Sequence, residues 1–124
     1  MIVSISIEGI PAHIEARIDA SDSETYRAFV ESLPLEGKVS RWGDEIYFHV
    51  GFRVPLERGA RSRMSVGEIA YWPNGPALAI FFGPTPVSED KRPMAASDCN
   101  VIGSTDCDPR DSAQSKGRGQ NNDL

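Results

Sequence analysis

The stretch from Val66 to Pro86 constrains the fold more than any other part of the sequence. Two short apolar runs, residues 68–72 and 77–83, flank the sequence Pro-Asn-Gly-Pro. Proline and glycine favour tight turns, and runs of this length that are rich in aromatic and branched side chains are typical of strands. The stretch therefore predicts two strands joined by a turn.

Four further segments have the pattern of short strands. Residues 2–8 and 12–18 alternate apolar and polar side chains, as the strands of a half-buried hairpin do. Residues 37–42 and 45–50 are also predicted to be strands, and residues 95–103 end in the short apolar sequence Asn-Val-Ile-Gly. Surface loops are expected over two segments, residues 53–65 and 85–94.

One helix is expected over about residues 22–33. Ser21 and Glu24 have the spacing of a capping box, in which two side chains satisfy each other's exposed backbone donors. Pro34 ends the helix because proline has no backbone N–H. The apolar residues of the segment recur at helical intervals, at Tyr26, Phe29, Val30 and Leu33. Short strands around one helix predict a mainly β protein, with either a closed barrel or a compact α+β sheet.

Composition restricts the partners and the location. The 124 residues suit a single domain, and the formal net charge of −5 argues against nucleic acid. The N-terminus lacks the pattern of a signal peptide, and no apolar run reaches the ~20 residues that span a bilayer. We therefore expect a cytoplasmic protein with no membrane partner. Cys99 and Cys107 match no zinc pattern, so two free thiols and no metal or cofactor are expected.

Three sequence blocks resemble a known group of proteins. They are RWGDEIYF at residues 41–48, GEIAYWPNGPALAIFFGPTP at residues 67–86 and NVIG at residues 100–103. Small stand-alone prokaryotic proteins with a cyclophilin-like fold, most of them uncharacterised, have similar blocks. The resemblance implies a closed, mostly antiparallel β-barrel capped by one helix.

The middle block is more distantly similar to cyclophilins, which are peptidyl-prolyl isomerases. The resemblance implies that Trp72 and Pro73 line a peptide groove and that Phe82 lies in a proline pocket. Ile80 stands where those enzymes have glutamine. Phe48 begins the counterpart of a Phe-His-Arg sequence on a strand that faces the groove.

That counterpart reads Phe-His-Val, because Val50 replaces the arginine. Rotation about a prolyl bond has a barrier of about 18–20 kcal/mol, which a donor aimed at the prolyl nitrogen lowers by weakening amide resonance. The valine side chain has no hydrogen-bond donor. Arg53 lies three residues after Val50, so strand alternation would point its side chain to the opposite face. No catalytic residue is assigned. The expected ligand-binding residues are Phe48, Val50, Arg53, Trp72, Pro73, Ile80 and Phe82.

Other polar residues have both a functional and a structural interpretation. His49 could act as an acid or base near neutral pH, or be a structural strand residue. Alternation places Glu45, Tyr47 and His49 on one face, so Asp44 and Glu45 point apart and make a poor catalytic pair. Four arginines could bind an anion or simply solvate a loop, at positions Arg53, Arg58, Arg61 and Arg63.

The apolar pattern stops abruptly after Gly103. Residues 104–124 contain no aromatic residue and no Ile, Val, Met or Phe. Such a segment buries too little surface to fold by itself. We therefore expect residues 1–103 to form the domain, and residues 104–124 to be a disordered tail or one altered by a frameshift.

Three functions fit these observations. The first is binding of a peptide or proline-containing segment in an aromatic groove, with weak or no isomerase activity. The second is isomerisation by an altered set of residues. The third is binding or conversion of a small cyclic amide or carboxylate, because cyclophilin-like barrels also occur in enzymes of 5-oxoproline metabolism. A monomer or weak homodimer is expected.

Overall fold

The computed structural model describes residues 1–8, 13–19 and 22–108. It contains eight strands and one helix among these residues, so the expectation of a mainly β protein with one helix is confirmed. The elements in chain order are β1 (Ile2–Ile5), β2 (Ile14–Ile18), α1 (Glu24–Ser32), β3 (Ser40–Arg41), β4 (Glu45–His49), β5 (Arg61–Arg63), β6 (Glu68–Trp72), β7 (Ala77–Phe81) and β8 (Met94–Thr105).

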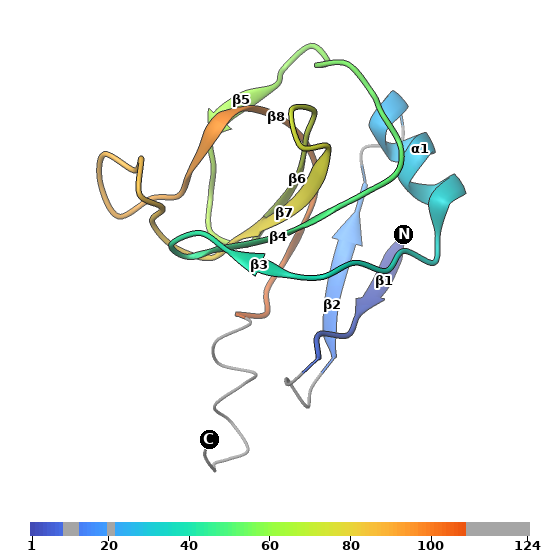
Figure 1. The fold of residues 1–124 in the computed structure, drawn as a ribbon, viewed down its shortest axis with the longest axis horizontal. Helices are drawn as coiled ribbons and strands as arrows, with labels where there is room; N and C mark the ends of the chain where they lie inside the picture. The colour runs from blue at the N-terminus through green and yellow to red at the C-terminus, as the bar shows by residue number, and fades with distance from the viewer. Residues whose placement is uncertain (9–12, 20–21, 109–124) are drawn as a thin grey trace.

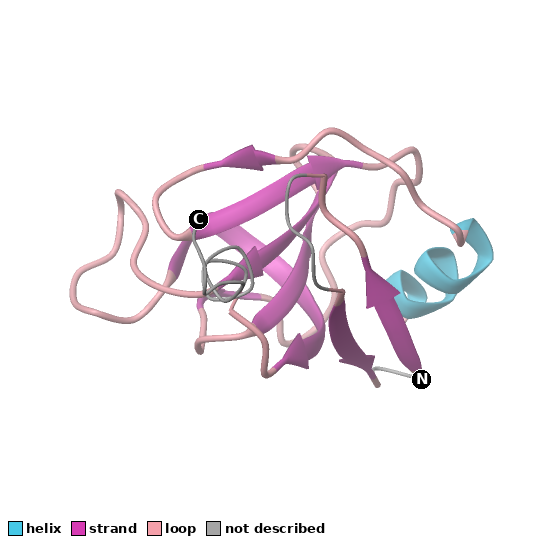
Figure 2. Cartoon of the chain, turned by 90° about the horizontal axis from the view of Figure 1, so that it is seen from below, coloured by secondary structure: helices cyan, strands magenta, loops and turns pink. Residues whose placement is uncertain are grey.

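The strands form one curled antiparallel sheet (Figure 1). Their order is β1-β2-β8-β6-β7-β4-β3, and β5 pairs with β8 beside this path. The first half of β8 pairs with β5, and its second half pairs with β6 and β2, so this long strand bends round the molecule. Figures 1 and 2 place α1 beside β1 and β2 at one end, with the loop between β7 and β8 at the opposite end.

The prediction of a closed barrel is wrong, because the sheet is an open half-barrel. Its path ends at β1 on one side and at β3 on the other, and the described residues show no pairing between these two strands. Closure requires the end strands to pair along their length. β3 has only two residues, both exposed, and therefore offers too short an edge for such pairing.

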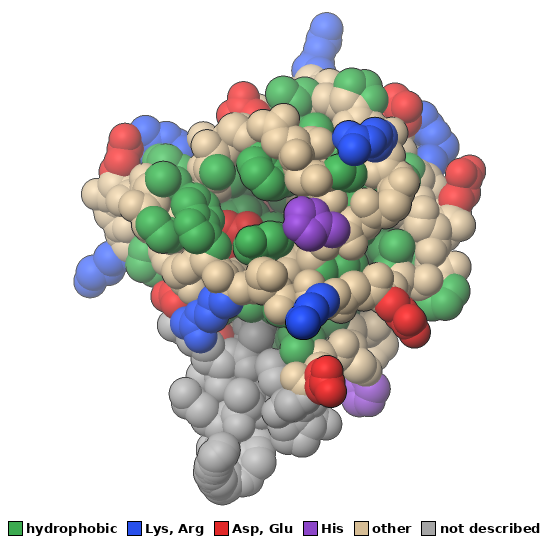
Figure 3. All heavy atoms as spheres, viewed as in Figure 1, with side chains coloured by type: hydrophobic (Ala, Val, Ile, Leu, Met, Phe, Trp, Pro, Cys, Tyr) green, Lys and Arg blue, Asp and Glu red, His purple; other side chains and the backbone are tan. Residues whose placement is uncertain are grey.

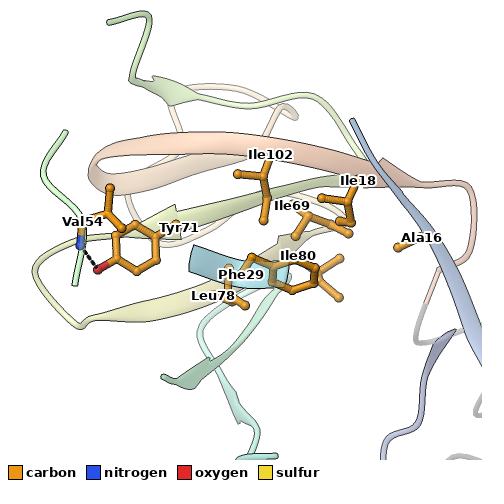
Figure 4. Close-up of a cluster of buried hydrophobic side chains, with 9 residues drawn as sticks. All are labelled: Ala16, Ile18, Phe29, Val54, Ile69, Tyr71, Leu78, Ile80 and Ile102. Atoms are coloured by element: carbon orange, nitrogen blue, oxygen red, sulfur yellow. Dashed lines mark hydrogen bonds between the residues drawn. The ribbon is translucent and has the colours of Figure 1, made fainter. Parts of the chain in front are cut away.

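The main core lies on one side of the sheet, which we call the helix face. Phe29 of α1 lies beside Leu78 and Ile80 of β7, beneath the strands that carry the remaining branched side chains (Figure 4). The Tyr71 hydroxyl donates to the Phe52 carbonyl at 3.1 Å and accepts from the Val54 backbone N–H at 3.0 Å. The buried members are Ala16, Ile18, Phe29, Val54, Ile69, Tyr71, Leu78, Ile80 and Ile102.

The helix is held at its N-terminus by two side chains. Ser23 is the N-cap and accepts from the Tyr26 backbone N–H at 3.1 Å. The Glu57 carboxylate, from the loop before β5, accepts from the backbone N–H groups of Glu24 and Thr25 and from the Ser23 hydroxyl. The predicted capping box depends on Ser21, which lies outside the described residues. The helix ends before Pro34, as predicted.

Several boundaries differ from the sequence expectation, and β3 covers only Ser40–Arg41 of the predicted strand 37–42. β5 lies within the expected loop 53–65, because its pairing with β8 is a contact between distant parts of the chain. β8 continues through Ser104 and Thr105, which the sequence assigned to the tail. Residues 109–124 of that tail lie outside the described residues.

Both cysteines are free, as the sequence predicted, with Cys99 buried and Cys107 partly exposed. Within the described residues, no helix has the length and the apolar character needed to cross a membrane.

Candidate functional site

A cavity of about 210 Å³ opens on the other side of the sheet, which we call the cavity face. Figure 3 shows this hollow bordered by hydrophobic side chains and, on one side, by a histidine, with acidic atoms visible inside it. Ten residues from four strands and their connections line it, namely Trp42, Glu45, Tyr47, Trp72, Ala77, Ala79, Phe81, Ala95, Ala96 and Cys99.

Small side chains on β7 create the space. Ala77 and Ala79 alternate with Leu78 and Ile80, so the large residues fill the helix face and the alanines face the cavity. Ala79 is paired with Ala70 of β6 and with Tyr47 of β4, which continues the row of cavity-face residues across the sheet. A sheet face that carries alanines between aromatic residues leaves a hollow at its centre.

A tight turn between β3 and β4 brings Trp42 and Glu45 into this hollow. Their backbones exchange two hydrogen bonds, from Trp42 N to Glu45 O at 2.9 Å and from Glu45 N to Trp42 O at 3.2 Å. Residues paired in this way project their side chains to the same face. Gly43 within the turn has φ +62°, and a Cβ there would lie 2.8 Å from Thr85 Cα. The turn is therefore fitted closely against the loop that follows β7.

Glu45 is the most unusual residue of the cavity. Its side chain is 9% exposed, and its Oε1 atom has no hydrogen-bond partner. Burial raises the pKa of this carboxyl from 4.5 to about 7. The group is therefore close to half-protonated at neutral pH. It can donate and accept hydrogen bonds when neutral, or pair with a cation when ionised.

The other polar atoms near the cavity are less reactive. Trp72 Nε1 donates to the Ser97 hydroxyl at 2.6 Å, which fixes the indole at the cavity wall. Burial, with a smaller contribution from the negative charges of Glu45 and Asp98, raises the pKa of the Cys99 thiol to about 12. A thiol that remains protonated is a poor nucleophile. Cys99 therefore serves as a small apolar wall residue.

The structure does not bring the seven predicted ligand-binding residues into one groove. Trp72 lines the cavity, and Pro73 follows it, partly exposed, outside the lining. Arg53 is exposed in the loop after β4. The other four are absent from the cavity lining. Phe48, Val50 and Ile80 point to the other side of the sheet and pack in the helix-face core. Phe82 is buried beneath Arg41, whose guanidinium carbon lies 5.6 Å from the centroid of the Phe82 ring. Their assignment as ligand-binding residues stays a prediction.

The two members of the Phe-Phe pair lie differently with respect to the cavity. Phe81 lines the cavity, opposite Glu45 across the β4–β7 pairing, whereas Phe82 does not. The alternation of Ala77, Ala79 and Phe81 with larger branched residues is the signal that could have identified the cavity face. Sequence reasoning did not predict the remaining residues of the cavity lining, Trp42, Glu45, Tyr47, Ala77, Ala79, Phe81, Ala95, Ala96 and Cys99.

The predicted faces of β4 are nevertheless confirmed. Glu45 and Tyr47 both line the cavity, and Asp44 points away to pair with Arg41 at 3.0 Å. His49 is exposed and meets Tyr47 edge-on, with ring centroids 6.1 Å apart. Asp44 and Glu45 thus do not form a catalytic carboxylate pair.

The arginine-rich segment lies beside a second cavity of about 270 Å³. Arg61 binds Glu68 through two hydrogen bonds at 2.6 and 2.9 Å, and Arg63 pairs with Glu89 at 3.1 Å. These arginines are neutralised by carboxylates of the same chain, which weakens the case for an anion site. In the part of the chain that the structure describes, no three His, Cys, Asp or Glu side chains cluster as metal ligands.

Comparisons with known proteins identify similar chains. A family model described as cyclophilin-like matches residues 1–119. The solution structure of a hypothetical protein from Archaeoglobus fulgidus is 40% identical in sequence and superposes with a TM-score of 0.69. That match covers 85% of this chain and 79% of the archaeal chain. No curated protein matches the chain.

Proposed function

Because the chain belongs to the cyclophilin-like family, we propose that its half-barrel binds a small organic molecule in the cavity beside Glu45 and Trp72. Family membership accounts for the fold, whereas the function has to be argued from the site. The proposal follows the small-molecule alternative that the sequence left open, in preference to the peptide groove.

One observation carries the proposal, namely that Glu45, whose buried Oε1 atom has no hydrogen-bond partner, lines the cavity. Leaving a buried polar atom without a hydrogen bond costs about 1–3 kcal/mol, and more for a charged group. A ligand that hydrogen-bonds to this oxygen removes that cost on binding. A mostly apolar cavity with a small number of well-placed polar groups is also the usual form of a small-molecule site.

The peptide-groove alternative has less support. It needs Phe48, Trp72 and Phe82 to share one surface, and only Trp72 lines the cavity. Isomerisation also lacks its arginine, since Val50 packs against the helix-face core. Of the two ligand types suggested by analogy, the lining favours an amide over a carboxylate. A carboxylate would meet Glu45, and no Lys, Arg or His is among the described residues that line the cavity.

The test is a binding screen with a variant that fills the cavity. Both tryptophans of the chain line the cavity, so intrinsic fluorescence reports on this site directly. Small amides, amines and carboxylates are screened beside proline-containing peptides, by fluorescence and by the shift in melting temperature. Ala79→Leu places a larger side chain in the hollow, and Ala60→Leu, in the loop before β5, is the matched control.

We expect a small molecule to raise the melting temperature of the wild type and of Ala60→Leu by several degrees, and to leave Ala79→Leu unchanged. Proline-containing peptides are expected to have no effect, and a protease-coupled assay is expected to show no isomerisation above background. A screen in which only the peptides bind, or in which the small-molecule hits bind Ala79→Leu equally well, would overturn the proposal.

A further inference from the structure

Four aromatic residues line the cavity together with Glu45, namely Trp42, Tyr47, Trp72 and Phe81. They come from the β3–β4 turn, β4, β6 and β7, so they enclose the hollow from different strands. Aromatic faces carry partial negative charge and attract cations, with tryptophan the most effective. The cavity therefore combines aromatic walls and one acidic group.

No positive charge in the described lining balances Glu45. The nearby cation of the β3–β4 turn, Arg41, is bound to the Asp44 carboxylate at 3.0 Å and to the Gly43 carbonyl at 2.8 Å. Its guanidinium also stacks over Phe82, which is not part of the cavity. The acidic group in the hollow thus has no counter-ion from its own chain among these neighbours.

We infer that the ligand's anchoring group is an organic cation, an alkylated ammonium held by the aromatic walls and by the Glu45 carboxylate. This inference rests on the proposed function and narrows the ligand class of the same site. An amide would hydrogen-bond to Glu45 but would gain little from the aromatic faces, whereas a cation gains from both.

Binding of such a cation is coupled to a proton. The cation binds the ionised carboxylate, so the proton of a neutral Glu45 passes to solvent when the complex forms, and the net charge inside the cavity stays zero. Burial without a ligand raises the pKa of Glu45 to about 7, and a bound cation lowers it.

The titratable groups around Glu45 come from several elements. β7 contributes only Ala77, Ala79 and Phe81 to the lining, and the Cys99 thiol of β8 stays protonated because its pKa is about 12. The remaining titratable groups of the surroundings are the Tyr47 phenol in the lining, the His49 imidazole that meets Tyr47 edge-on, the Asp98 carboxylate beside Cys99, and the Arg41–Asp44 pair behind the turn.

The test compares a cation with its neutral isostere. Choline and 3,3-dimethylbutan-1-ol have the same shape and differ in one charge, and tryptophan fluorescence follows the binding of each to the full chain. We expect choline to bind at least tenfold more tightly than the alcohol. Its affinity should rise about tenfold between pH 6 and pH 8, as a carboxyl with a pKa of about 7 ionises.

Glu45→Gln keeps the size of the side chain and removes its charge. In this variant, choline should lose its advantage over the alcohol and its pH dependence, whereas Glu15→Gln on the exposed face of β2 should behave as the wild type. Equal binding of both compounds to the wild type, abolished by Ala79→Leu, would overturn the cation inference and leave the small-molecule proposal standing. No binding of choline to the wild type at either pH would also overturn it.

Discussion

At the scale of single residues, strand pairing holds Glu45 in a buried position where the ionised form of its carboxyl is unfavourable. The strand pairing of β4 with β7 holds it opposite Phe81, and its side chain is only 9% exposed. A buried carboxyl without a donor is destabilising. Groups retained at such a cost are found most often where a protein binds or transforms something.

The first prediction concerns Glu45→Gln. The folded carboxyl has a pKa of about 7 against 4.5 for its ordinary value, so the folded chain holds a proton that the unfolded chain loses between these values. The stability that this group contributes is complete below pH 4.5 and is lost as pH rises through 7. Glutamine has no such proton. The free energy of unfolding of Glu45→Gln relative to the wild type should therefore rise by about 2–3 kcal/mol from pH 5 to pH 8.

Urea unfolding at the two pH values measures this difference. Glu15→Gln removes a carboxyl from an exposed position on β2 and serves as the control, with no comparable change expected. A difference between Glu45→Gln and the wild type that stays constant with pH would mean that Glu45 ionises normally in the folded protein.

The sequence was informative about single residues where strand parity decides the answer. It placed Glu45 and Tyr47 on one face and Asp44 on the other, and the structure agrees. It did not predict that Phe81 rather than Phe82 lines the cavity, because the resemblance to cyclophilins was carried over without counting alternation along β7. It also did not predict that Ala77 and Ala79 line a cavity, which forms because their side chains are small.

At the scale of elements, the β3–β4 turn holds two of the cavity's residues, Trp42 and Glu45. Gly43 in this turn has φ +62°, and a Cβ there would lie 2.8 Å from Thr85 Cα and 2.9 Å from Pro86 Cδ. The turn therefore needs glycine both for its backbone conformation and for its close contact with the following loop.

We predict that Gly43→Ala destabilises the protein more than Gly59→Ala. Both glycines have positive φ, but a Cβ on Gly59 would meet nothing within 4 Å. Gly59→Ala should cost about 1–2 kcal/mol for the left-handed backbone alone. Gly43→Ala should cost about 1–3 kcal/mol more because of the clash, and should shift the tryptophan emission as Trp42 moves. Equal losses in chemical denaturation would contradict the close packing of this turn.

The attachment of α1 to the barrel depends on Glu57. Burial raises the pKa of this carboxyl, but hydrogen bonds from Thr25, Ser23 and the backbone of Glu24 outweigh that effect and hold the pKa below its ordinary value. Asn100 extends the contact, since its side chain accepts from Glu57 N at 2.8 Å and donates to the Thr25 hydroxyl at 3.0 Å.

Glu57→Gln should lower the free energy of unfolding at pH 7 by about 1–3 kcal/mol, because hydrogen bonds to a charged group are lost. Since the folded pKa is lowered, the contribution of Glu57 is present above its ordinary pKa and is lost as pH falls through the folded value. The deficit of the variant should therefore shrink in acid. Glu31→Gln, exposed on α1, is the control, and a similar loss there would argue against a specific role for Glu57.

Elements that depend on local pattern were predicted well, and elements that depend on distant partners were not. The helix and the hairpin of β6 and β7 follow from periodicity and turn residues near each other in the chain. β5 and the bend of β8 arise from pairing between segments that are far apart in sequence. Sequence alone therefore predicted a loop where β5 lies.

At the scale of the whole molecule, closure of the barrel is a property that no single segment determines. The strands were recognised individually, yet whether the first and last of them meet depends on the curvature and length of all of them. The open half-barrel ends at β1 on one side and at the two-residue β3 on the other.

The fourth prediction concerns the end of the sheet. Thr105 is buried, pairs with Ala16, and donates from its backbone N–H to the Gly67 carbonyl at 2.8 Å and from its hydroxyl to the Glu15 carbonyl at 2.6 Å. A chain of residues 1–103 should therefore be less stable than a chain of residues 1–108 by several kcal/mol. Equal melting temperatures for the two chains would place the boundary of the domain at Gly103, where the sequence pattern puts it.

The most direct test of the account is an NMR titration of the Glu45 side-chain carboxyl carbon, with and without tetramethylammonium. We expect a Glu45 pKa of about 7 in the free protein and a lower pKa in the presence of the cation. A Glu45 pKa near 4.5 that does not respond to the cation would contradict it, because the cavity would then contain neither a destabilised acid nor a site for positive charge.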